Sequence, residues 1–327
     1  MSTKLKRPAT PRIRSPRHGS PQSNQLSNLE VQRPGGDGDI DTLHIRLWKS
    51  CGPPGLRLTR EDSDAQVAYL KSRKPHESPT VLFDGEFYLS QLPWFARNNI
   101  DPLDHYLRVG WSQGLSPHIA FDSAYVAEQC GIRIWSEPPL LRYFEHADEV
   151  SPNRLFDVDI YRRYVNVSAH HYARLFEVFL GDWRSARAPF SRLFSLYFYA
   201  KFELVTREGG VNPLVHYLAT DSHRRRDPSP MVHNRWYDIR YPAYPGEPSD
   251  PLSRFAMIGL KRGDLPNPLA AQQLKLTDPT AGVARELLLE YVDVSAVDAK
   301  WFENGGMNGF RQKYDGSRAQ ASANQSP

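Results

Sequence analysis

The sequence repeats itself, and this repetition limits the folds that it can form. A Phe-Asp pair occurs at Phe83-Asp84, at Phe121-Asp122 and at Phe156-Asp157, so that 38 and then 35 residues separate successive copies. Weaker copies begin at Leu193-Phe194 and at Met231-Val232. Self-similarity at a period of this length is typical of stacked supersecondary units. The sequence therefore predicts a repeat protein.

A second landmark, a Pro-Leu pair, returns in the same phase as the first. It occurs at Pro102-Leu103 and comes back at Pro139-Leu140, Pro213-Leu214 and Pro251-Leu252. The third copy of the Phe-Asp landmark lacks a Pro-Leu partner, and the fourth copy of Phe-Asp has lost its aspartate. Two landmarks that keep one phase indicate a single repeated unit that has diverged along the chain.

The first copy of the unit predicts a helical hairpin. Asp84 can accept hydrogen bonds from the free amides of a first helix, which should end near Pro93 because proline disrupts a continuing helix. A second helix should begin at Pro102, since proline suits the first helical position. In that helix Tyr106 falls on the same face as Leu103. Gly110 is placed to take the left-handed conformation that ends a helix.

A hairpin with one apolar side is too small to bury that side alone, so neighbouring units must stack. We therefore expect an all-α fold, an array of about five helical-hairpin repeats with a period of 35 to 38 residues and disordered termini. The following residues have structural roles in this interpretation: Phe83, Asp84, Pro102, Leu103, His105, Tyr106, Phe121, Asp122, Pro139, Phe156, Asp157, Pro213, His216, Tyr217 and Pro251.

The array is predicted to cover residues 83–268. Residues 1–41 read as a disordered basic tail, and residues 42–82 as a linker with one short capping helix near Val67. Residues 269–314 should form a helical cap whose helix starts at Asp278, and residues 315–327 a disordered tail.

The net charge of +4 is concentrated at the N-terminus. Residues 1–20 contain six Lys and Arg and no acidic residue, which leaves a balance of −2 on the remainder. Such a tail could bind nucleic acid or an anionic membrane surface weakly, although a solvated arm without a ligand is the commoner case. No apolar stretch is long enough to cross a bilayer. We therefore expect a cytoplasmic protein, or one peripheral to the inner membrane.

The landmarks resemble a bacterial repeat of the form Phe-Asp-x-x-Tyr-Tyr-Leu, followed by Asp/Asn-Pro-Leu-x-His-Tyr-Leu and Gly-x-x-x-Gly-x-x-Pro. Residues 83–117 match it well and residues 213–218 match it in part, and the likeness extends over about 185 residues. That repeat accompanies glycosyltransferase domains in surface-polysaccharide proteins similar to rhamnan-synthesis proteins. The resemblance implies an association with polysaccharide assembly and a polysaccharide-synthesis enzyme as protein partner. It implies no catalytic activity, because the repeat is not the catalytic part.

Residues with catalytic potential have structural explanations. Asp157 and Asp159 have the Asp-x-Asp spacing with which some glycosyltransferases hold a metal ion, but Asp157 is already explained as a helix cap. His105 and His216 occupy equivalent positions of two units, which favours packing over catalysis. His170-His171 has no further ligand at metal spacing, and residues 305–309 read as a glycine-rich loop. We therefore predict no catalytic residue, no cofactor and no metal.

One basic cluster lies inside the array, at Arg224, Arg225 and Arg226, and it is a candidate anion-binding site. The leading hypothesis is a non-catalytic interaction or scaffold protein linked to cell-surface polysaccharide synthesis. One alternative is a fragment or divergent form of a glycosyltransferase, the enzyme class expected if the chain is an enzyme. Another is an anion- or nucleic-acid-binding adaptor that uses residues 1–20.

Overall fold

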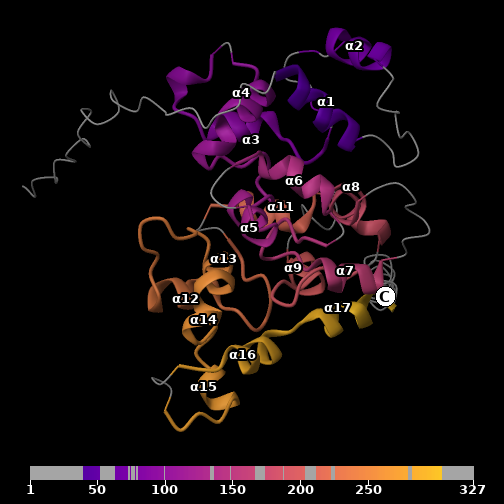
Figure 1. Cartoon of the computed structure of the whole chain (residues 1–327). Coiled ribbons are helices and arrows are strands. Elements are labelled where there is room, and N and C mark those ends of the chain that lie inside the picture. Colours follow the sequence, from indigo (N-terminus) through magenta and orange to yellow (C-terminus); the bar gives the residue numbers. More distant parts are fainter. Residues whose placement is uncertain are drawn as a thin grey trace, which may run out of the picture. The chain divides into compact units, whose positions relative to one another are not determined.

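The computed structural model describes residues 40–51, 63–72, 74, 78, 80–98, 100–132, 136–147, 149–165, 174–186, 188–202, 211–221, 225–278 and 282–303. The chain divides into two compact units, and all of these residues belong to the second, Gly38–Pro327. They are helical and form no β-strand (Figure 1). The predicted all-α fold is confirmed. The predicted disordered ends lie outside the described residues except for Ile40 and Asp41, which belong to the helix Ile40–Cys51 and correct the predicted boundary of the N-terminal tail.

Two kinds of helix alternate along the chain, and together they form successive pairs. The helices that follow the Phe-Asp landmark are α3 (Gly85–Ser90), α5 (Ser123–Gln129), α7 (Val158–Tyr164), α9 (Leu196–Phe202) and α12 (Asn234–Arg240). The second helices of the pairs are α4 (Pro102–Arg108), α6 (Pro139–Glu145), α8 (Leu175–Ala186), α11 (Pro213–Ala219) and α13 (Pro251–Arg254). All of them except α8 begin at a Pro-Leu pair. The last of these continues through a π-helical turn, Phe255–Gly259, into α14 (Leu260–Arg262).

The first helix of each pair begins where a side chain caps its free amides. Asp84 Oδ1 accepts from the amide of Phe87 at 3.0 Å, and Asp122 and Asp157 make equivalent bonds at the starts of α5 and α7. Ser195 caps α9 with its hydroxyl, and His233 caps α12 through its ring nitrogen Nδ1. The capping position is thus kept at all five helices while the capping residue changes.

A recurring backbone hydrogen bond links each capping residue to the start of the next pair. The amide of Asp84 donates to the Pro117 carbonyl at 2.8 Å, and the amide of Asp122 donates to the Pro152 carbonyl at 2.8 Å. The same bond runs from Asp157 to Phe190, from Ser195 to Pro228 and from His233 to Pro266. Because each bond crosses from one pair to the next, neighbouring pairs are held in register. The number of repeat units remains a prediction.

A buried polar side chain follows each of these carbonyls and stabilises the turn into the next helix. His118, for example, accepts from the amide of Ala120 at 3.0 Å, and Asn153 accepts from the amide of Leu155 at 2.8 Å. Thr80 has the equivalent position before α3, and the side chains that follow the five carbonyls are His118, Asn153, Ser191, Ser229 and Asn267; all six are buried. The sixth, Asn267, lies beyond the five capped helices and precedes a short helix, α15 (Ala270–Gln273). This turn was not recognised in the sequence, because the residue type varies from copy to copy.

The core consists of aromatic rings from both kinds of helix. Tyr88 and Tyr106 pack edge to face, with ring centroids 5.8 Å apart and planes at 89°. Tyr199 and Tyr217 repeat this arrangement at 6.0 Å and 74°. Phe121 and Phe194, which lie just before α5 and α9, pack edge to face on Tyr143 and Tyr217 at 5.6 and 5.5 Å, in both cases with planes at 89°. All of these rings are buried. Burial of such rings supplies most of the stabilisation that a short hairpin lacks by itself.

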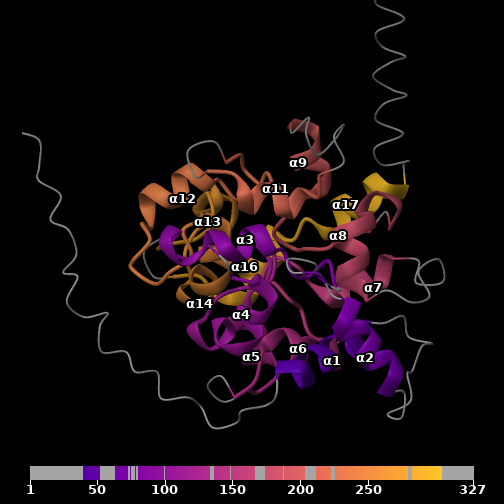
Figure 2. The same ribbon diagram turned by 90° about the horizontal axis from the view of Figure 1, so that it is seen from above.

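The N-terminal segment of this unit forms two helices, α1 (Ile40–Cys51) and α2 (Ser63–Ser72), where one short helix was expected. Helix α1 contacts α4 and α6, and Figure 2 shows α1 between α2 and α6. Leu47 is fully buried, and the buried His44 places Nε2 2.5 Å from Asp104 Oδ1 on α4. The rings of Trp48 and Tyr69 stack at 5.0 Å and join α1 to α2.

The C-terminal part differs from the prediction of one helix starting at Asp278. A helix, α16, runs over Arg285–Val292, and a second, α17, runs over Ser295–Glu303. The cause is local, because Asp293 accepts from both the amide and the hydroxyl of Ser295 and so begins a new helix after the break at residue 293. Helix α17 packs against α9.

Candidate functional site

Both aspartates of the Asp-x-Asp pair, Asp157 and Asp159, make hydrogen bonds or ion pairs with residues of α7. Asp157 Oδ1 accepts from the amides of Asp159 and Ile160, at 3.1 and 3.0 Å, while Asp159 pairs with Arg162 at 2.8 Å. Across the described residues, no cluster of three or more His, Cys, Asp or Glu could hold a metal ion. The structure therefore uses Asp157 to begin α7, as the sequence interpretation had it.

The two matched histidines each meet a tyrosine of the preceding helix. His105 Nδ1 lies 2.6 Å from Tyr88 Oη, and His216 Nδ1 lies 2.8 Å from Tyr199 Oη. Burial lowers the pKa of His105 and raises the pKa of Tyr88 well above its usual range, so both groups stay neutral and the imidazole Nδ1 accepts a hydrogen bond from the phenolic hydroxyl. These pairs join the two helices of a hairpin. The tyrosine partners were missed from the sequence, although both lie 17 residues before their histidine.

Gly110 does not take the predicted left-handed conformation, which is instead adopted by Gly114 with φ of 77°. Gly110 is required for another reason: a Cβ at this position would overlap Tyr88 Oη. Gly259 has the same relationship to Tyr237 Oη, further along the chain. The glycine therefore makes room for the buried tyrosine and does not act as a helix terminator.

Tyr106 and Tyr217, which follow the two histidines, connect one hairpin to the next. The amide of Leu140, at the start of α6, donates to Tyr106 Oη at 3.4 Å. Tyr217 Oη donates to Asn234 Oδ1, at the start of α12, at 3.3 Å. Both rings are completely buried. The His-Tyr pair of the sequence thus has two structural tasks, one within a hairpin and one between hairpins.

The predicted anion-binding cluster lies only in part within the described residues, so it stays a prediction. Arg224 lies outside the described residues. Arg225 Nε donates to the Tyr217 carbonyl at 3.0 Å, and its guanidinium lies 5.2 Å from the Tyr217 ring centre. Arg226 is exposed, and its carbonyl accepts from Asn234. Arg225 therefore stabilises the end of α11. His170-His171 and residues 305–309 also lie outside the described residues.

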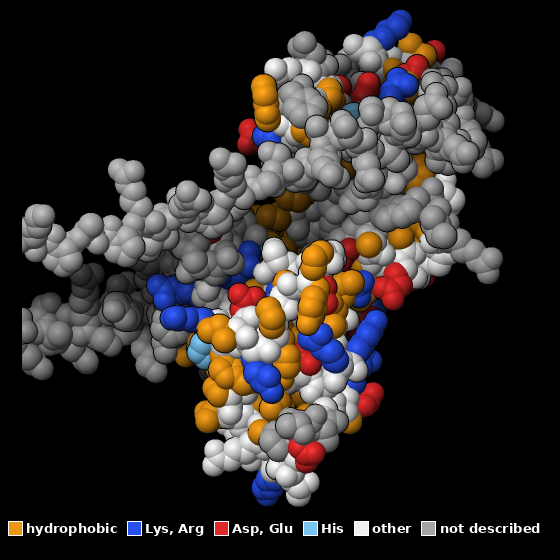
Figure 3. Space-filling model, turned by 90° about the vertical axis from the view of Figure 1, so that its left-hand side faces the viewer, with side chains coloured by type: hydrophobic (Ala, Val, Ile, Leu, Met, Phe, Trp, Pro, Cys, Tyr) orange, Lys and Arg blue, Asp and Glu red, His pale blue; other side chains and the backbone are white. Residues whose placement is uncertain are grey.

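The end of α12 and the turn that follows it present apolar side chains to solvent. We call Ile239, Pro242, Ala243 and Tyr244 the turn surface; Ile239 is 73% exposed and Tyr244 is 65% exposed. On the face shown in Figure 3, hydrophobic side chains gather over the region of α12 to α15, with Lys and Arg among them. Contiguous exposed apolar side chains of this kind are typical of interaction sites.

Hydrogen bonds within the turn stabilise the turn surface. Tyr244 and Glu247 exchange hydrogen bonds, from the Glu247 amide to the Tyr244 carbonyl at 3.0 Å and from the Tyr244 amide to Glu247 Oε2 at 3.1 Å. Gly246 supplies the left-handed residue that this turn requires, with φ of 89°. The turn therefore has a defined conformation before any partner binds.

A fully buried arginine fixes the base of the same turn. Arg254 Nη1 donates to the Pro248 carbonyl at 3.0 Å, and Nη2 lies 2.5 Å from Asp238 Oδ1. Its guanidinium lies 5.7 Å from the ring centre of Tyr237. Arg254 follows Tyr237 by 17 residues, the offset that separates each paired tyrosine from its histidine. This offset is the sequence signal that could have identified it.

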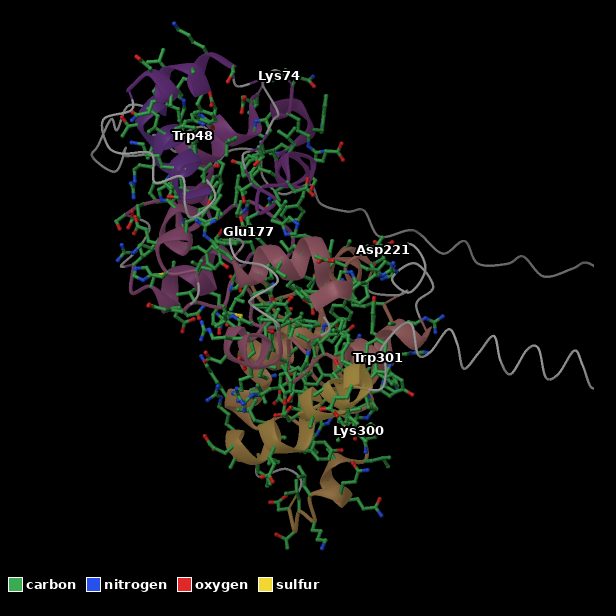
Figure 4. The ribbon with its side chains drawn as sticks, turned by 90° about the vertical axis from the view of Figure 1, so that its right-hand side faces the viewer. Trp48, Lys74, Glu177, Asp221, Lys300 and Trp301 are labelled. Carbon is green, nitrogen blue, oxygen red and sulfur yellow. The ribbon has the colours of Figure 1, made fainter. Side chains whose placement is uncertain are left out.

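An open pocket of about 520 Å³ adjoins the turn surface. Its walls come from the end of α11, with Leu218 and Asp221, and from the turn, with Pro242 and Ala243; Asp238 and Arg225 also line it. Figure 4 shows Asp221 at the end of α11. The described lining residues offer carboxylate, guanidinium and apolar groups together, so the pocket can receive polar and apolar groups of a partner.

Comparisons with protein-family models, with curated proteins and with solved structures give no match to this chain. No described helix has the length and apolar character needed to cross a membrane.

Proposed function

We propose that this chain is a non-catalytic helical-repeat interaction protein that binds a protein partner in cell-surface polysaccharide synthesis. The observation that carries the proposal is the turn surface, in which Ile239 on α12 and Tyr244 in the following turn are exposed, and buried Arg254 holds the base of that turn. Aromatic anchors on a preorganised turn bind partners at low entropic cost. The link to polysaccharide synthesis comes from the resemblance of the repeat.

The roles of the chemically capable residues also support this proposal over an enzyme. Asp157 caps α7, and His105 and His216 hold tyrosines. A catalytic residue needs a unique environment, whereas these residues make the same bonds in more than one hairpin. Their chemistry is therefore used to build the array.

Binding of purified full-length chain to purified polysaccharide-synthesis enzymes encoded beside its gene tests the proposal. Ile239→Ser and Tyr244→Ala should each weaken binding at least tenfold, because loss of an apolar anchor at an interface centre commonly costs more than about 1.4 kcal/mol. Val67→Ser on α2 is the matched control, since Val67 is also exposed. The affinity of the Val67→Ser variant for the enzyme should equal that of the wild type.

Two results would overturn the proposal. One is equal binding by wild type and both turn-surface variants. The other is turnover of a sugar nucleotide by the purified chain that is lost in Asp157→Ala, which would identify a divergent glycosyltransferase.

A further inference from the structure

In the second and third helix pairs an arginine lies beside the aspartate that caps the first helix. Arg154 Nε lies 3.4 Å from Asp122 Oδ2, and the Arg154 guanidinium lies 4.2 Å from the ring centre of Tyr125. Arg192 Nε lies 3.6 Å from Asp157 Oδ2. In both aspartates Oδ1 accepts from the helix amides, so the arginine pairs with the oxygen that capping leaves over.

The position of this arginine is fixed by the backbone hydrogen bond that recurs along the array. Each arginine lies two residues after the carbonyl that accepts from the amide of its aspartate. In the first pair that carbonyl belongs to Pro117, which accepts from the amide of Asp84, so the equivalent residue is Ile119. The first pair therefore has the capping aspartate without its arginine.

The fourth and fifth pairs have neither the aspartate cap nor the arginine. Ser195 caps α9, and its hydroxyl donates to Asp298 of α17 at 2.7 Å. His233 caps α12. Pro230 and Pro268 stand at the arginine position of these two pairs. Of the five described pairs, only the first thus combines an aspartate cap with an uncharged residue at the arginine position.

An open pocket of about 630 Å³ lies beside the aspartate of the first pair, at the start of α3 (Figure 1). Asp84 and Glu86 supply two carboxylates to its walls, and Val81, Phe83 and Leu89 supply apolar surface. Among the described residues neither carboxylate has an ion-pair partner. The walls thus suit the apolar stem and the charged head of an arginine side chain.

A buried histidine offers one further group to this pocket. His118 lines the pocket and is only 8% exposed, and its Nδ1 accepts from the Ala120 amide at 3.0 Å. Burial lowers the pKa of His118 to about 4, so the ring is neutral at pH 7 and carries its proton on Nε2. No described residue accepts a hydrogen bond from Nε2. This donor is available to a carbonyl oxygen of a ligand.

We propose that this pocket binds an arginine side chain of a partner protein, in the place that Arg154 and Arg192 fill in the next two pairs. The guanidinium pairs with Asp84 and Glu86, and the methylene stem contacts the apolar walls. A backbone carbonyl beside the arginine accepts from His118. The site goes beyond the proposed function, because it shares no residue with the turn surface.

Titration of the full chain with a short peptide that carries one arginine between alanines tests the proposal. Methyl NMR signals of Val81 and Leu89 report on the pocket, and the arginine peptide should shift both until they saturate. The matching citrulline peptide has nearly the same shape without the charge, so it should bind at least about tenfold more weakly. No polysaccharide-synthesis enzyme enters this measurement, so its outcome is independent of the proposed function.

Two matched variants test the role of the capping carboxylate. Asp84→Asn keeps a side-chain oxygen that caps α3 and removes the charge, so the arginine peptide should bind about tenfold more weakly. Asp122→Asn makes the same change at a cap whose charge is already paired with Arg154. The affinity of Asp122→Asn for the arginine peptide should therefore equal that of the wild type.

A third variant fills the pocket from within the chain. Ile119→Arg should fold, because Arg154 and Arg192 stand at equivalent positions, and it should abolish binding of the arginine peptide. Ile119→Gln adds length without charge and should still bind it. The proposal is wrong if the arginine peptide causes no shift at about 10 mM. It is also wrong if the citrulline peptide binds equally well, if Asp84→Asn binds as the wild type does, or if folded Ile119→Arg does.

Discussion

Tyr88 Oη and His105 Nδ1 lie 2.6 Å apart, and the same contact joins Tyr199 to His216 at 2.8 Å. In both cases the tyrosine lies on the first helix of a hairpin and the histidine on the second. The contact therefore fixes the crossing of two helices that are each only seven residues long or shorter. Helices of this length are unstable alone and depend on tertiary contacts.

Removing the phenolic hydroxyl should destabilise the protein only where it has a histidine partner. Tyr88→Phe and Tyr199→Phe should each lower the free energy of unfolding by about 1 kcal/mol, since each leaves the ring nitrogen of a half-buried histidine without its donor. Tyr161→Phe is the matched control. Among the described residues the Tyr161 hydroxyl has no hydrogen-bond partner, so its loss should cost less than about 0.5 kcal/mol. Urea unfolding gives the free energy of unfolding of all three variants. Equal losses in the three variants would contradict a stabilising role for the Tyr–His hydrogen bonds.

Gly110 should tolerate no side chain. Gly110→Ala places a methyl group against the hydroxyl of buried Tyr88, and the resulting displacement should cost about 1 to 3 kcal/mol. Gly181→Ala on α8 is the control, because a Cβ there meets no atom within 4 Å. Its unfolding free energy should stay unchanged or rise by up to about 1 kcal/mol, as expected for alanine in a helix. The double variant Tyr88→Phe with Gly110→Ala should recover part of the loss.

Asp157 should behave as a helix cap and not as a metal ligand. Asp157→Ala should lower the free energy of unfolding by about 1 kcal/mol, the usual cost of a lost cap. Asp159→Ala removes an exposed ion pair with Arg162 and should change it by less than about 0.5 kcal/mol. Thermal unfolding with and without Mn²⁺ supplies the second readout. A rise in Tm with Mn²⁺ that disappears in both variants would instead establish an Asp-x-Asp metal site.

His118 should make this protein sensitive to acid. Burial lowers the pKa of His118 to about 4, below the value of 6.5 for the unfolded chain, so the unfolded state binds more protons between these values. The stability that neutral His118 contributes is present above pH 6.5 and is lost as the pH falls toward 4. From pH 7 to pH 4 the loss should be about 3 kcal/mol.

The array provides its own control for this prediction. Asn153 and Asn267 occupy the position of His118 in other turns and accept the same backbone hydrogen bond. His118→Asn should therefore fold normally at pH 7 and lose less stability than wild type on acidification. Urea unfolding at several pH values gives the difference between the two proteins. Parallel curves would mean that His118 does not titrate on unfolding.

Several elements of the fold could be predicted because their causes are local. Asp84, Asp122 and Asp157 accept from amides two or three residues ahead, so the helix starts can be recognised in short segments of sequence. The equivalence of His105 and His216 was likewise visible from the repeat. Gly110 was assigned the wrong role because a helix terminator and a glycine required for close packing look alike in sequence.

The amino-acid sequence by itself determined the helical class, the phase of the two landmarks and the capped starts of the helices, since each depends on residues close in the chain. Only the tertiary structure decided which distant groups complete them. Asp298 on α17 caps α9, His44 on α1 meets Asp104 on α4, and Arg254 holds the turn surface. The first two contacts join segments 60 to 102 residues apart, where no local pattern specifies a partner and burial of apolar surface brings the groups together.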